Sequence, residues 1–529
     1  MQRKMEFKLR SEDEEIKDAG LTIDLDEIAR RGVMSKSEKI IAKWYGIYGS
    51  RQPGNHMARI VTPGGVMTSS QARNIARVSE KYGMGVLSVT TRQAIQFHWL
   101  KLGSLADMIR GLSEEGSSTM HGCGDVTRQV AACPLAETCP YRRLDVRPWA
   151  ARLQKYLGDA EDLDNLPRKF KITLSGCAGG CAQPYINCLG LIAVQKTREG
   201  QTVRGFQAIV GGGMGWDPYV GQELFSFIPE DKILSVARAV ALTFRDHGDR
   251  FNRATSRLKV VVALNGIEQV RAWVLENLAA EGVDTRTLET APIEETGPAI
   301  PDRPLAHMKH PVGTDGKAVV RVLVPKGELA HHQLRRLAEL SEIFGDQKVY
   351  TNNRQNFEIH GVEPEKVKTL EAEVHHLGFA TDGFFGIRDI VPCVGTTYCP
   401  KAVTETRALF DLLFPLVSQE KFKKVENKVQ INITGCPNSC SPYRIVDIGF
   451  RGLRIRNEEQ GSVEGYEVLL GGDQRAFGKK LGEFKKDDCV QVVESILDAF
   501  LKLRNDEETL TQTVTRVGLE PFSQAVYQE

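Results

Sequence analysis

Eleven cysteines give this chain of 529 residues its clearest chemical signal, because eight of them follow one spacing rule. The rule occurs once in each half of the chain: Cys133-x5-Cys139 with Cys177-x3-Cys181, and Cys393-x5-Cys399 with Cys436-x3-Cys440. Four thiolates in two close pairs suit either a tetrahedral metal ion or an iron–sulfur cluster. Structural zinc pairs usually enclose about two to four residues, so the x5 pairs favour a cluster. The unrepeated Cys123, Cys188 and Cys489 are interpreted as small core or surface thiols.

Basic residues between the cysteine motifs are a second chemical feature. Arg59 and Arg92 lie in strand-like segments, Arg128 follows a Gly-Asp pair in a loop, and Lys169 and Lys171 alternate along a predicted strand. Side chains at i and i+2 of a strand point to the same face. Alone, the lysine pair is typical of a solvated edge strand. Together with the cysteine tetrads, the basic set favours a cationic pocket beside a metal centre.

An internal duplication relates the two tetrads, which lie about 260 residues apart. Residues unrelated to sulfur chemistry align at nearly the same offset: Arg59 with Arg321, Arg92 with Arg354, Arg128 with Arg388, Lys169 with Lys428, and Gly211-Gly212 with Gly471-Gly472. The duplication predicts a second pocket, lined by Arg321, Arg354, Arg388 and Lys428 and facing the N-terminal tetrad. In that pocket Gln430 replaces Lys171.

An α/β pattern in each half must position these residues. Segments 57–63, 86–91 and 95–100 have strand-like composition, whereas 69–83 and 328–345 have apolar residues at helical spacing and end at glycine. A proline-rich polar stretch near 287–310 separates the halves. We divide the chain into an N-terminal arm (1–40), two α/β half-domains (41–115 and 311–380), two cysteine-bearing domains (116–290 and 381–529) and a linker (291–310).

Composition excludes several classes of protein. The chain has 69 basic and 68 acidic residues, which argues against nucleic acid as a main partner. Its 41% hydrophobic and 26% charged residues are typical of a globular protein of several domains. No membrane span or secretory signal is evident, so we expect a cytoplasmic protein without membrane contact, in which thiols stay reduced.

The motifs MARIVTPGG, TTRQAIQFH, GDVTRQV, LPRKFK, C-x5-C and GCPNSC resemble those of the sulfite and nitrite reductases that couple sirohaem to a [4Fe–4S] cluster. The resemblance implies an internally duplicated α+β fold, with two ferredoxin-like half-units and two sirohaem/[4Fe–4S] domains around a pseudo-two-fold axis. It also implies roles for single residues. Cys393, Cys399, Cys436 and Cys440 would hold the cluster, with Cys440 bridging it to the sirohaem iron. Arg59, Arg128, Lys169 and Lys171 would bind the substrate anion, and Thr90, Arg92 and Gln96 would contact sirohaem.

The chemistry of this reaction agrees with the residue types. The six-electron reduction of sulfite to sulfide needs a redox metal with an open position, an electron relay, and cations that hold and protonate the oxyanion. Arginine suits oxyanion binding, and lysine releases a proton when neighbouring cations lower its pKa. We expect sulfite as the substrate, because many nitrite-reducing relatives have asparagine at the position of Lys171. Nitrite reduction with the same cofactors is the alternative. A non-catalytic iron–sulfur carrier or zinc scaffold is an alternative of another class.

The N-terminal tetrad, Cys133, Cys139, Cys177 and Cys181, departs from the assimilatory members of this family, which generally carry only the C-terminal one. We expect it to hold a second cluster with a relay or structural role, and the second pocket to hold either a non-catalytic sirohaem or no macrocycle. The chain shows no flavin or nicotinamide domain, so electrons must come from a ferredoxin or from a partner flavoprotein or iron–sulfur subunit.

Overall fold

The computed structural model describes residues 11–457 and 461–527, so residues 1–10 of the predicted N-terminal arm lie outside the described residues. Three short helices precede the duplicated part of the chain: α1 (Glu12–Asp18), α2 (Leu25–Arg31) and α3 (Lys36–Ile41). Side chains cap the N-termini of α2 and α3. The Asp24 carboxylate accepts from two backbone N–H groups of α2, and Ser35 forms a capping box with Glu38 in α3.

Each ferredoxin-like half-domain contains strands and two helices in similar order. The first comprises β1 (Ile47–Gly49), β2 (Asn55–Ile60), β3 (Val66–Thr68), α4 (Ser69–Tyr82), β4 (Val86–Val89), β5 (Ile95–Lys101) and α5 (Leu105–Ser113). The second comprises β11 (Ala318–Val322), β12 (Glu328–Ala330), α9 (His331–Phe344), β13 (Lys348–Thr351), β14 (Phe357–Val362) and α10 (Val367–His376). The predicted helix over 328–345 therefore begins later, because its first three residues form β12.

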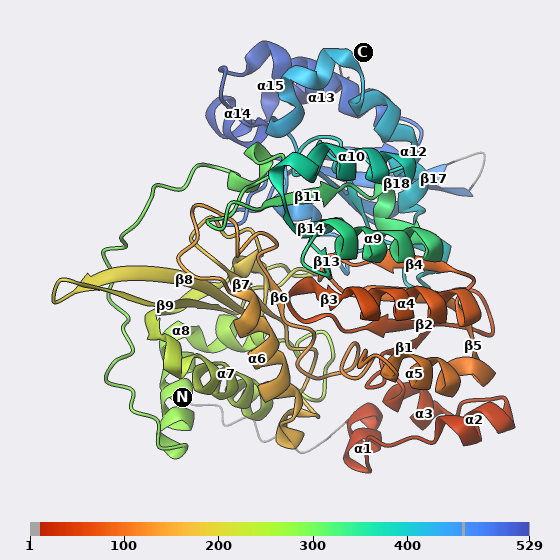
Figure 1. Cartoon of the computed structure of the whole chain (residues 1–529), viewed down its shortest axis with the longest axis vertical. Coiled ribbons are helices and arrows are strands. Elements are labelled where there is room, and N and C mark those ends of the chain that lie inside the picture. The colour runs from red at the N-terminus through yellow and green to blue at the C-terminus, as the bar shows by residue number, and fades with distance from the viewer. Residues whose placement is uncertain (1–10, 458–460, 528–529) are drawn as a thin grey trace.

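The two half-domains exchange one strand each. β12 joins the sheet β1-β2-β5-β4-β12 by pairing antiparallel with β4, where Leu329 lies opposite Leu87. Reciprocally, β3 joins the sheet β11-β14-β13-β3, where Met67 lies opposite Val349. These four side chains belong to one hydrophobic core that the half-domains share. Neither half-domain has a complete sheet by itself, so the exchange ties the two half-domains together, and Figure 1 shows β3 beside β13.

The cysteine-bearing domains also repeat one plan. The first contains β6 (Ala131–Ala132), α6 (Arg147–Gly158), β7 (Ile172–Ser175), β8 (Leu189–Arg198), β9 (Gln201–Val210), β10 (Gln222–Pro229), α7 (Ile233–His247) and α8 (Leu258–Ala280). The second contains β15 (Val391–Pro392), α11 (Gly395–Tyr398), α12 (Thr406–Val417), β16 (Ile431–Thr434), β17 (Ile448–Asn457), β18 (Gly461–Leu470), β19 (Lys479–Lys485), α13 (Cys489–Leu503), α14 (Leu510–Val517) and α15 (Glu520–Tyr527). Their sheets have the orders β10-β9-β8-β7-β6 and β15-β16-β17-β18-β19. In both sheets, the first cysteine of the tetrad directly follows the short edge strand. The third cysteine follows the neighbouring strand after one intervening glycine.

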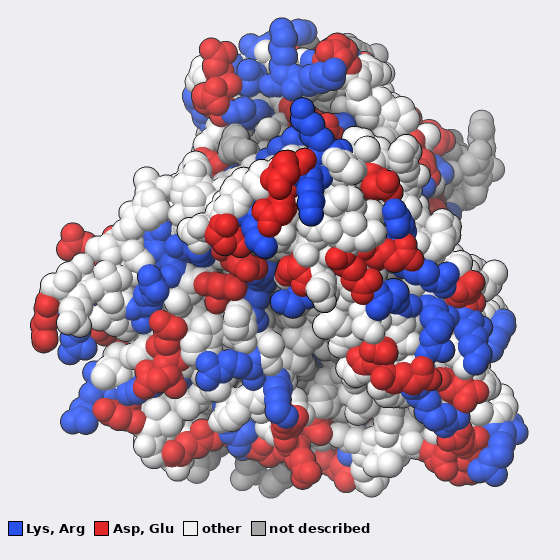
Figure 2. All heavy atoms as spheres, in the orientation of Figure 1, with Lys and Arg blue, Asp and Glu red and all other residues white. Residues whose placement is uncertain are grey.

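The surface and the helices bear on two of the sequence-based expectations. Basic and acidic side chains are interspersed on the face of the molecule shown in Figure 2. Within residues 11–457 and 461–527, no helix is long and apolar enough to cross a membrane. The cytoplasmic location and the absence of a nucleic-acid partner stay predictions.

Candidate active site at the junction of the two halves

A cavity lies where the first cysteine-bearing domain faces the C-terminal tetrad. Arg92, Lys169 and Lys171 of the first half line it together with Cys440 of the second half. Four of the eleven residues predicted for the first site thus share one cavity, although Arg92 and Cys440 are more than 340 positions apart in the sequence. The strand exchange makes this possible, because it places the first half-domain against the second cysteine-bearing domain.

Lys169 and Lys171 both face the cavity, although the residues around them do not form the predicted strand. β7 begins only at Ile172. Phe170, which lies between the two lysines, is fully buried. Its N–H donates to the carbonyl of residue 126 and its carbonyl accepts from the N–H of residue 128, so Phe170 forms an isolated bridge with Thr127. Because Phe170 packs into the core, both lysines emerge on the opposite side. Burial, with the nearby Arg257 and Arg128, lowers the pKa of Lys169 to about 7. Burial and the Lys169 charge hold the pKa of Lys171 well below its ordinary value.

Arg92 lies in the tight turn between β4 and β5 rather than within a strand. The Thr90 hydroxyl accepts from the backbone N–H groups of Arg92 and Ala94, at 3.2 and 3.1 Å, and so holds that turn. The Arg92 guanidinium donates to Asn187 Oδ1 at 2.9 Å and to two backbone carbonyls, whereas its Nε is buried without a partner. Thr90 therefore positions the arginine, and Arg92 keeps one donor for a further ligand.

Arg59, Arg128 and Gln96 form a cluster next to this cavity without lining it. Nη1 of Arg59 and Nη1 of Arg128 both donate to the Gly122 carbonyl, at 2.9 and 3.0 Å. Gln96, with its amide oxygen turned toward Arg59, accepts from Nη2 at 2.6 Å and from Nε at 3.2 Å. Arg59 also contacts the Cys123 sulfur at 3.2 Å. Burial lowers the pKa of Arg92 to about 9, and the charges of Arg128 and Arg59 contribute to this lowering.

The positive charges of this site have no carboxylate partners. Within the described residues, no Asp or Glu forms an ion pair with Arg59, Arg92, Arg128, Lys169 or Lys171, whose polar contacts are to carbonyls, amides and a thiol. Buried cations are normally paired, because removing them from water is costly. A concentration of unpaired cations around a cavity therefore indicates a site for an anionic ligand.

The C-terminal tetrad adjoins the same cavity through its last member. Cys440 is exposed to the cavity, and Thr91 of the first half donates its hydroxyl to the Cys440 carbonyl at 2.7 Å. Cys393, Cys399 and Cys436 lie behind Cys440 and away from the cavity lining. The Gly435 N–H donates to the Cys393 sulfur at 3.2 Å. Burial and the neighbouring Cys440 raise the pKa of Cys393 to about 12, so a metal is needed to hold these groups as thiolates.

Sequence reasoning missed Thr91, Asn187 and Arg257, which also line the cavity. Arg257 precedes helix α8, and its Nη2 lies 3.5 Å from the Cys188 sulfur. Burial raises the pKa of Cys188, but the Arg257 guanidinium lowers it, and the net pKa is below the ordinary value. Cys188 is a core thiol, as the sequence indicated, and it contacts the guanidinium of a cavity-lining arginine. The available signal was the Arg-x-Lys pair at 257 and 259, at the start of an apolar helix with no acid beside it.

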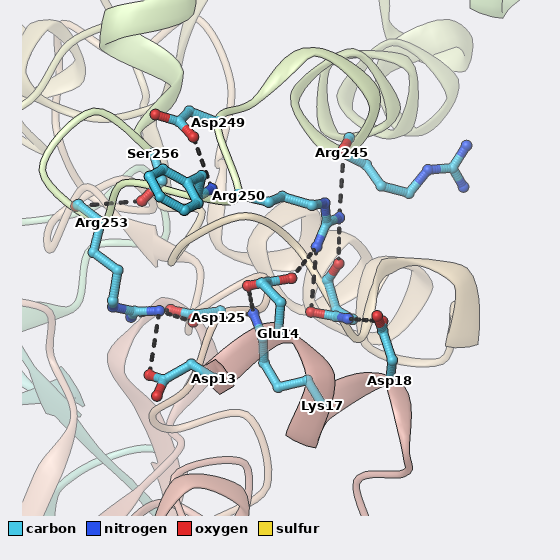
Figure 3. Close-up of polar contacts among 12 residues, drawn as sticks. Asp13, Glu14, Lys17, Asp18, Asp125, Arg245, Asp249, Arg250, Arg253 and Ser256 are labelled. Atoms are coloured by element: carbon cyan, nitrogen blue, oxygen red, sulfur yellow. Dashed lines mark hydrogen bonds and ion pairs between the residues drawn. The ribbon is translucent and has the colours of Figure 1, made fainter. Parts of the chain in front are cut away.

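Helix α1 braces the loops that carry Arg128 and Arg257 (Figure 3). Arg253 Nη1 bonds to Asp125 Oδ2 at 3.0 Å, and Arg250 Nη1 bonds to the buried Glu14 at 2.8 Å. Lys17 of α1 contacts Glu14 and lies 3.5 Å from Asp125. Asp125 and Arg253 stand only a few residues from Arg128 and Arg257. The network therefore ties the N-terminal helix to both loops, through contacts across more than a hundred residues that no sequence pattern reveals.

The second pocket differs from the prediction. Of its four predicted basic residues only Arg354 lines it, beside Cys181 and Gln430, and each of the four has an acidic partner. These ion pairs are Arg321 with Glu358, Arg354 with Asp389, Arg388 with Glu426, and Lys428 with Glu507. Residues 300–305 of the linker also line the cavity. The four duplicated cations survive in sequence but are paired with acids, so they do not supply the unpaired charge that their counterparts supply to the first pocket.

Two family models match the chain. The model described as the nitrite and sulphite reductase 4Fe-4S domain matches residues 123–281 and 385–529, which is more than half of the chain. The nitrite/sulfite reductase ferredoxin-like half domain matches residues 48–115 and 310–377. The chain belongs to the nitrite and sulfite reductases.

Curated relatives and a solved structure agree with this family. A protein named sulfite reductase (ferredoxin) from Mycobacterium tuberculosis is 28% identical and covers 95% of this chain and 94% of its own length. An assimilatory ferredoxin-dependent nitrite reductase from Haloferax mediterranei is 29% identical and covers 94% of this chain and 89% of its own length. The structure of the Mycobacterium tuberculosis NirA protein matches with a TM-score of 0.86 at 26% identity and covers 97% of both chains.

Membership confirms the duplicated α+β fold, the use of sirohaem and a [4Fe–4S] cluster, and an enzyme that reduces sulfite or nitrite. It sets aside the interpretation as a non-catalytic carrier or zinc scaffold. The chemistry of the side chains that line the first cavity fits the cofactors. Sirohaem carries several carboxylates, and the buried Nε atoms of Arg92 and Arg257 both lack a partner in the described structure. Cys440 presents its thiol at the same cavity.

Proposed function

We propose that this reductase converts sulfite to sulfide at a sirohaem held in the first cavity. The observation that carries the proposal is the placement of Lys171 beside Lys169 on the cavity wall, where no carboxylate of the described residues pairs with either lysine. A second ammonium adds charge and a proton donor, both of which favour a doubly charged oxyanion whose oxygens must leave as water. An asparagine at this position would supply neither.

The residues that would hold the cofactors come from both halves. Arg92 and Arg257 would pair with carboxylates of sirohaem, and Cys393, Cys399, Cys436 and Cys440 would hold the cluster, with the Cys440 thiolate toward the cavity. When bound, sirohaem supplies the iron at which the anion is reduced and the cluster supplies its electrons.

The protein side chains bind the anion and manage its protons. We assign Arg59 and Arg128, which adjoin the cavity without lining it, mainly to attracting and binding the anion, because guanidinium groups suit an oxyanion and these two are fixed through the shared Gly122 carbonyl. We assign Lys169 and Lys171 to binding and to proton delivery from Nζ. The pKa of Lys169, about 7, lies where an ammonium gives up a proton readily at neutral pH. An arriving anion raises both lysine pKa values, so it recruits the protons that the reaction consumes.

The relatives support a proposal for the electron donor. Sulfite and nitrite reductases at 28 and 29% identity are named as ferredoxin-dependent, so we propose a ferredoxin as the donor of this chain. A flavoprotein or iron–sulfur subunit is the competing donor.

Nitrite is the second candidate substrate, because relatives named as nitrite reductases match as closely as those named as sulfite reductases. The Lys171→Asn variant distinguishes the two. Rates with sulfite and with nitrite are measured with the same reductant, and sirohaem content is measured for each sample. We expect the sulfite rate to fall at least tenfold more than the nitrite rate, with Lys171→Arg as the control that keeps the charge. A sulfite-to-nitrite ratio unchanged by Lys171→Asn would remove the argument for sulfite.

A further inference from the structure

The N-terminal tetrad, Cys133, Cys139, Cys177 and Cys181, takes no part in the site described above, yet it has the same scaffold as the C-terminal tetrad. Cys133 follows β6 and donates its N–H to the Leu174 carbonyl at 2.8 Å, as Cys393 donates to Ile433 at 2.8 Å. In both domains three parallel strands, β6-β7-β8 and β15-β16-β17, place the first and third cysteines side by side. The backbone therefore brings the four N-terminal cysteines together as it does the C-terminal four.

Contacts between the halves repeat this equivalence. Thr91 of the first half-domain bonds to the Cys440 carbonyl at 2.7 Å, and Asn353 of the second half-domain bonds to the Cys181 carbonyl at 2.8 Å. Asn353 lines both cavities, so the two tetrads lie on either side of a shared wall. The last cysteine of each tetrad reaches its own cavity.

The N-terminal thiols are more secluded than the C-terminal ones. Cys133, Cys139 and Cys177 are 3 to 5% exposed, whereas among the first three C-terminal cysteines only Cys436 is buried. A Cβ on Gly179 would meet the Cys177 sulfur at 3.4 Å, so the backbone passes close to the thiols. In the part of the chain that the structure describes, no three His, Cys, Asp or Glu side chains are arranged to hold a single metal ion. Thiolates spread around a larger inorganic group suit a cluster better than zinc.

The cavity beside this tetrad is large, at about 520 Å³, but the charge pairing of its arginines disfavours a second macrocycle. Arg354, the counterpart of Arg92, forms a buried ion pair with Asp389 at 2.6 Å, and Gln430 replaces a lysine. Arg303, from the linker, is likewise paired with Asp447 at 2.6 Å. Two of the three arginines that line this cavity, Arg303 and Arg354, are therefore paired with carboxylates, and Arg475 is the third. A ligand with many carboxylates would find fewer available cations here than in the first cavity, and linker residues 300–305 form part of the wall.

We propose that Cys133, Cys139, Cys177 and Cys181 hold a second [4Fe–4S] cluster and that this cluster carries no sirohaem. The cysteines bind as thiolates, so their thiol protons leave when the cluster is inserted. The chain is then a two-cluster, one-sirohaem reductase. The proposal is independent of the substrate: a protein that reduces only nitrite would have the same iron content.

Metal analysis of the full chain, purified without oxygen, tests both clauses. Iron, acid-labile sulfide, zinc and extracted sirohaem are counted per chain. We expect about eight iron atoms outside sirohaem, a matching amount of sulfide and about one sirohaem. About four such iron atoms, or about one zinc in place of the second four, would overturn the second cluster. About two sirohaems per chain would overturn the clause that this cluster stands alone.

Cysteine variants assign the iron to its site. The Cys133→Ser/Cys177→Ser double variant should lose about half of the non-sirohaem iron and keep its sirohaem absorption. The matched Cys393→Ser/Cys436→Ser variant should lose the other half and alter that absorption, and Cys489→Ala should retain all of the iron. If the first variant does not fold, electron paramagnetic resonance of the reduced wild type decides. A cluster signal uncoupled from sirohaem supports the proposal, and its absence refutes it.

Discussion

Replacing Asp389 with asparagine should destabilise the protein strongly, because it leaves Arg354 charged and buried. Asp389 Oδ2 accepts from Arg354 Nε at 2.6 Å and from the Phe385 N–H at 2.8 Å, and Oδ1 accepts from Asn356 at 2.9 Å. The two ion-pair side chains are only 3 and 2% exposed. Removing one partner of such a pair costs about 3–5 kcal/mol, since the remaining charge stays desolvated. Asparagine preserves shape and some hydrogen bonding, so we expect about 3 kcal/mol.

Urea unfolding followed by circular dichroism measures this loss, and two further variants control for it. Asp382, which pairs with Arg388 at 3.1 Å, is 53% exposed, so Asp382→Asn should cost less than about 1 kcal/mol. The Arg354→Met/Asp389→Leu double variant removes both charges and should recover part of the loss. If Asp389→Asn costs no more than Asp382→Asn, Arg354 does not depend on Asp389, and its charge is not neutralised by this pair.

Three further predictions concern the first site and its support. Because the pKa of Lys169 is about 7 when folded and near its ordinary 10.5 when unfolded, the unfolded chain binds more protons between these values. The Lys169 contribution to the stability of cofactor-free protein therefore rises with pH over that window. Lys169→Met should stabilise that protein by about 1–2 kcal/mol more at pH 7 than at pH 9 in paired unfolding curves, and a pH-independent difference would contradict the shift. Arg257→Met should lower the amount of sirohaem bound per chain, measured by absorption, whereas Arg257→Lys should retain most of it. Equal sirohaem content in Arg257→Met and the wild type would exclude a cofactor-binding role for Arg257. Glu14→Ala should cost about 2–3 kcal/mol and expose α1 to proteolysis, because Lys17 and Arg250 lose their shared carboxylate. The control is Glu12→Ala, which breaks the exposed ion pair of Glu12 with Lys36. If Glu14→Ala costs as little as Glu12→Ala, α1 does not brace the site.

Much of the first site follows from local sequence. The cysteine spacings, the alternation of Lys169 and Lys171, and the arginines of the repeated motifs identify the right residues because their chemistry and spacing are local properties. Errors arose where geometry depends on distant contacts. Lys169 and Lys171 share a face because Phe170 is buried against residues 126–128, not because they lie in a strand, and Arg92 owes its position to a turn closed by Thr90.

The sequence by itself determined the duplication, the two cysteine tetrads and the family of the enzyme. Only the tertiary structure decided that the two pockets are unlike. An alignment of the halves treats Arg92 and Arg354 as equivalent, but Arg354 meets Asp389 and Lys428 meets Glu507, at separations of 35 and 79 residues. Whether a cation remains available to a ligand depends on the carboxylates that folding brings beside it. No periodicity along the chain records that pairing, because it is a property of three-dimensional proximity.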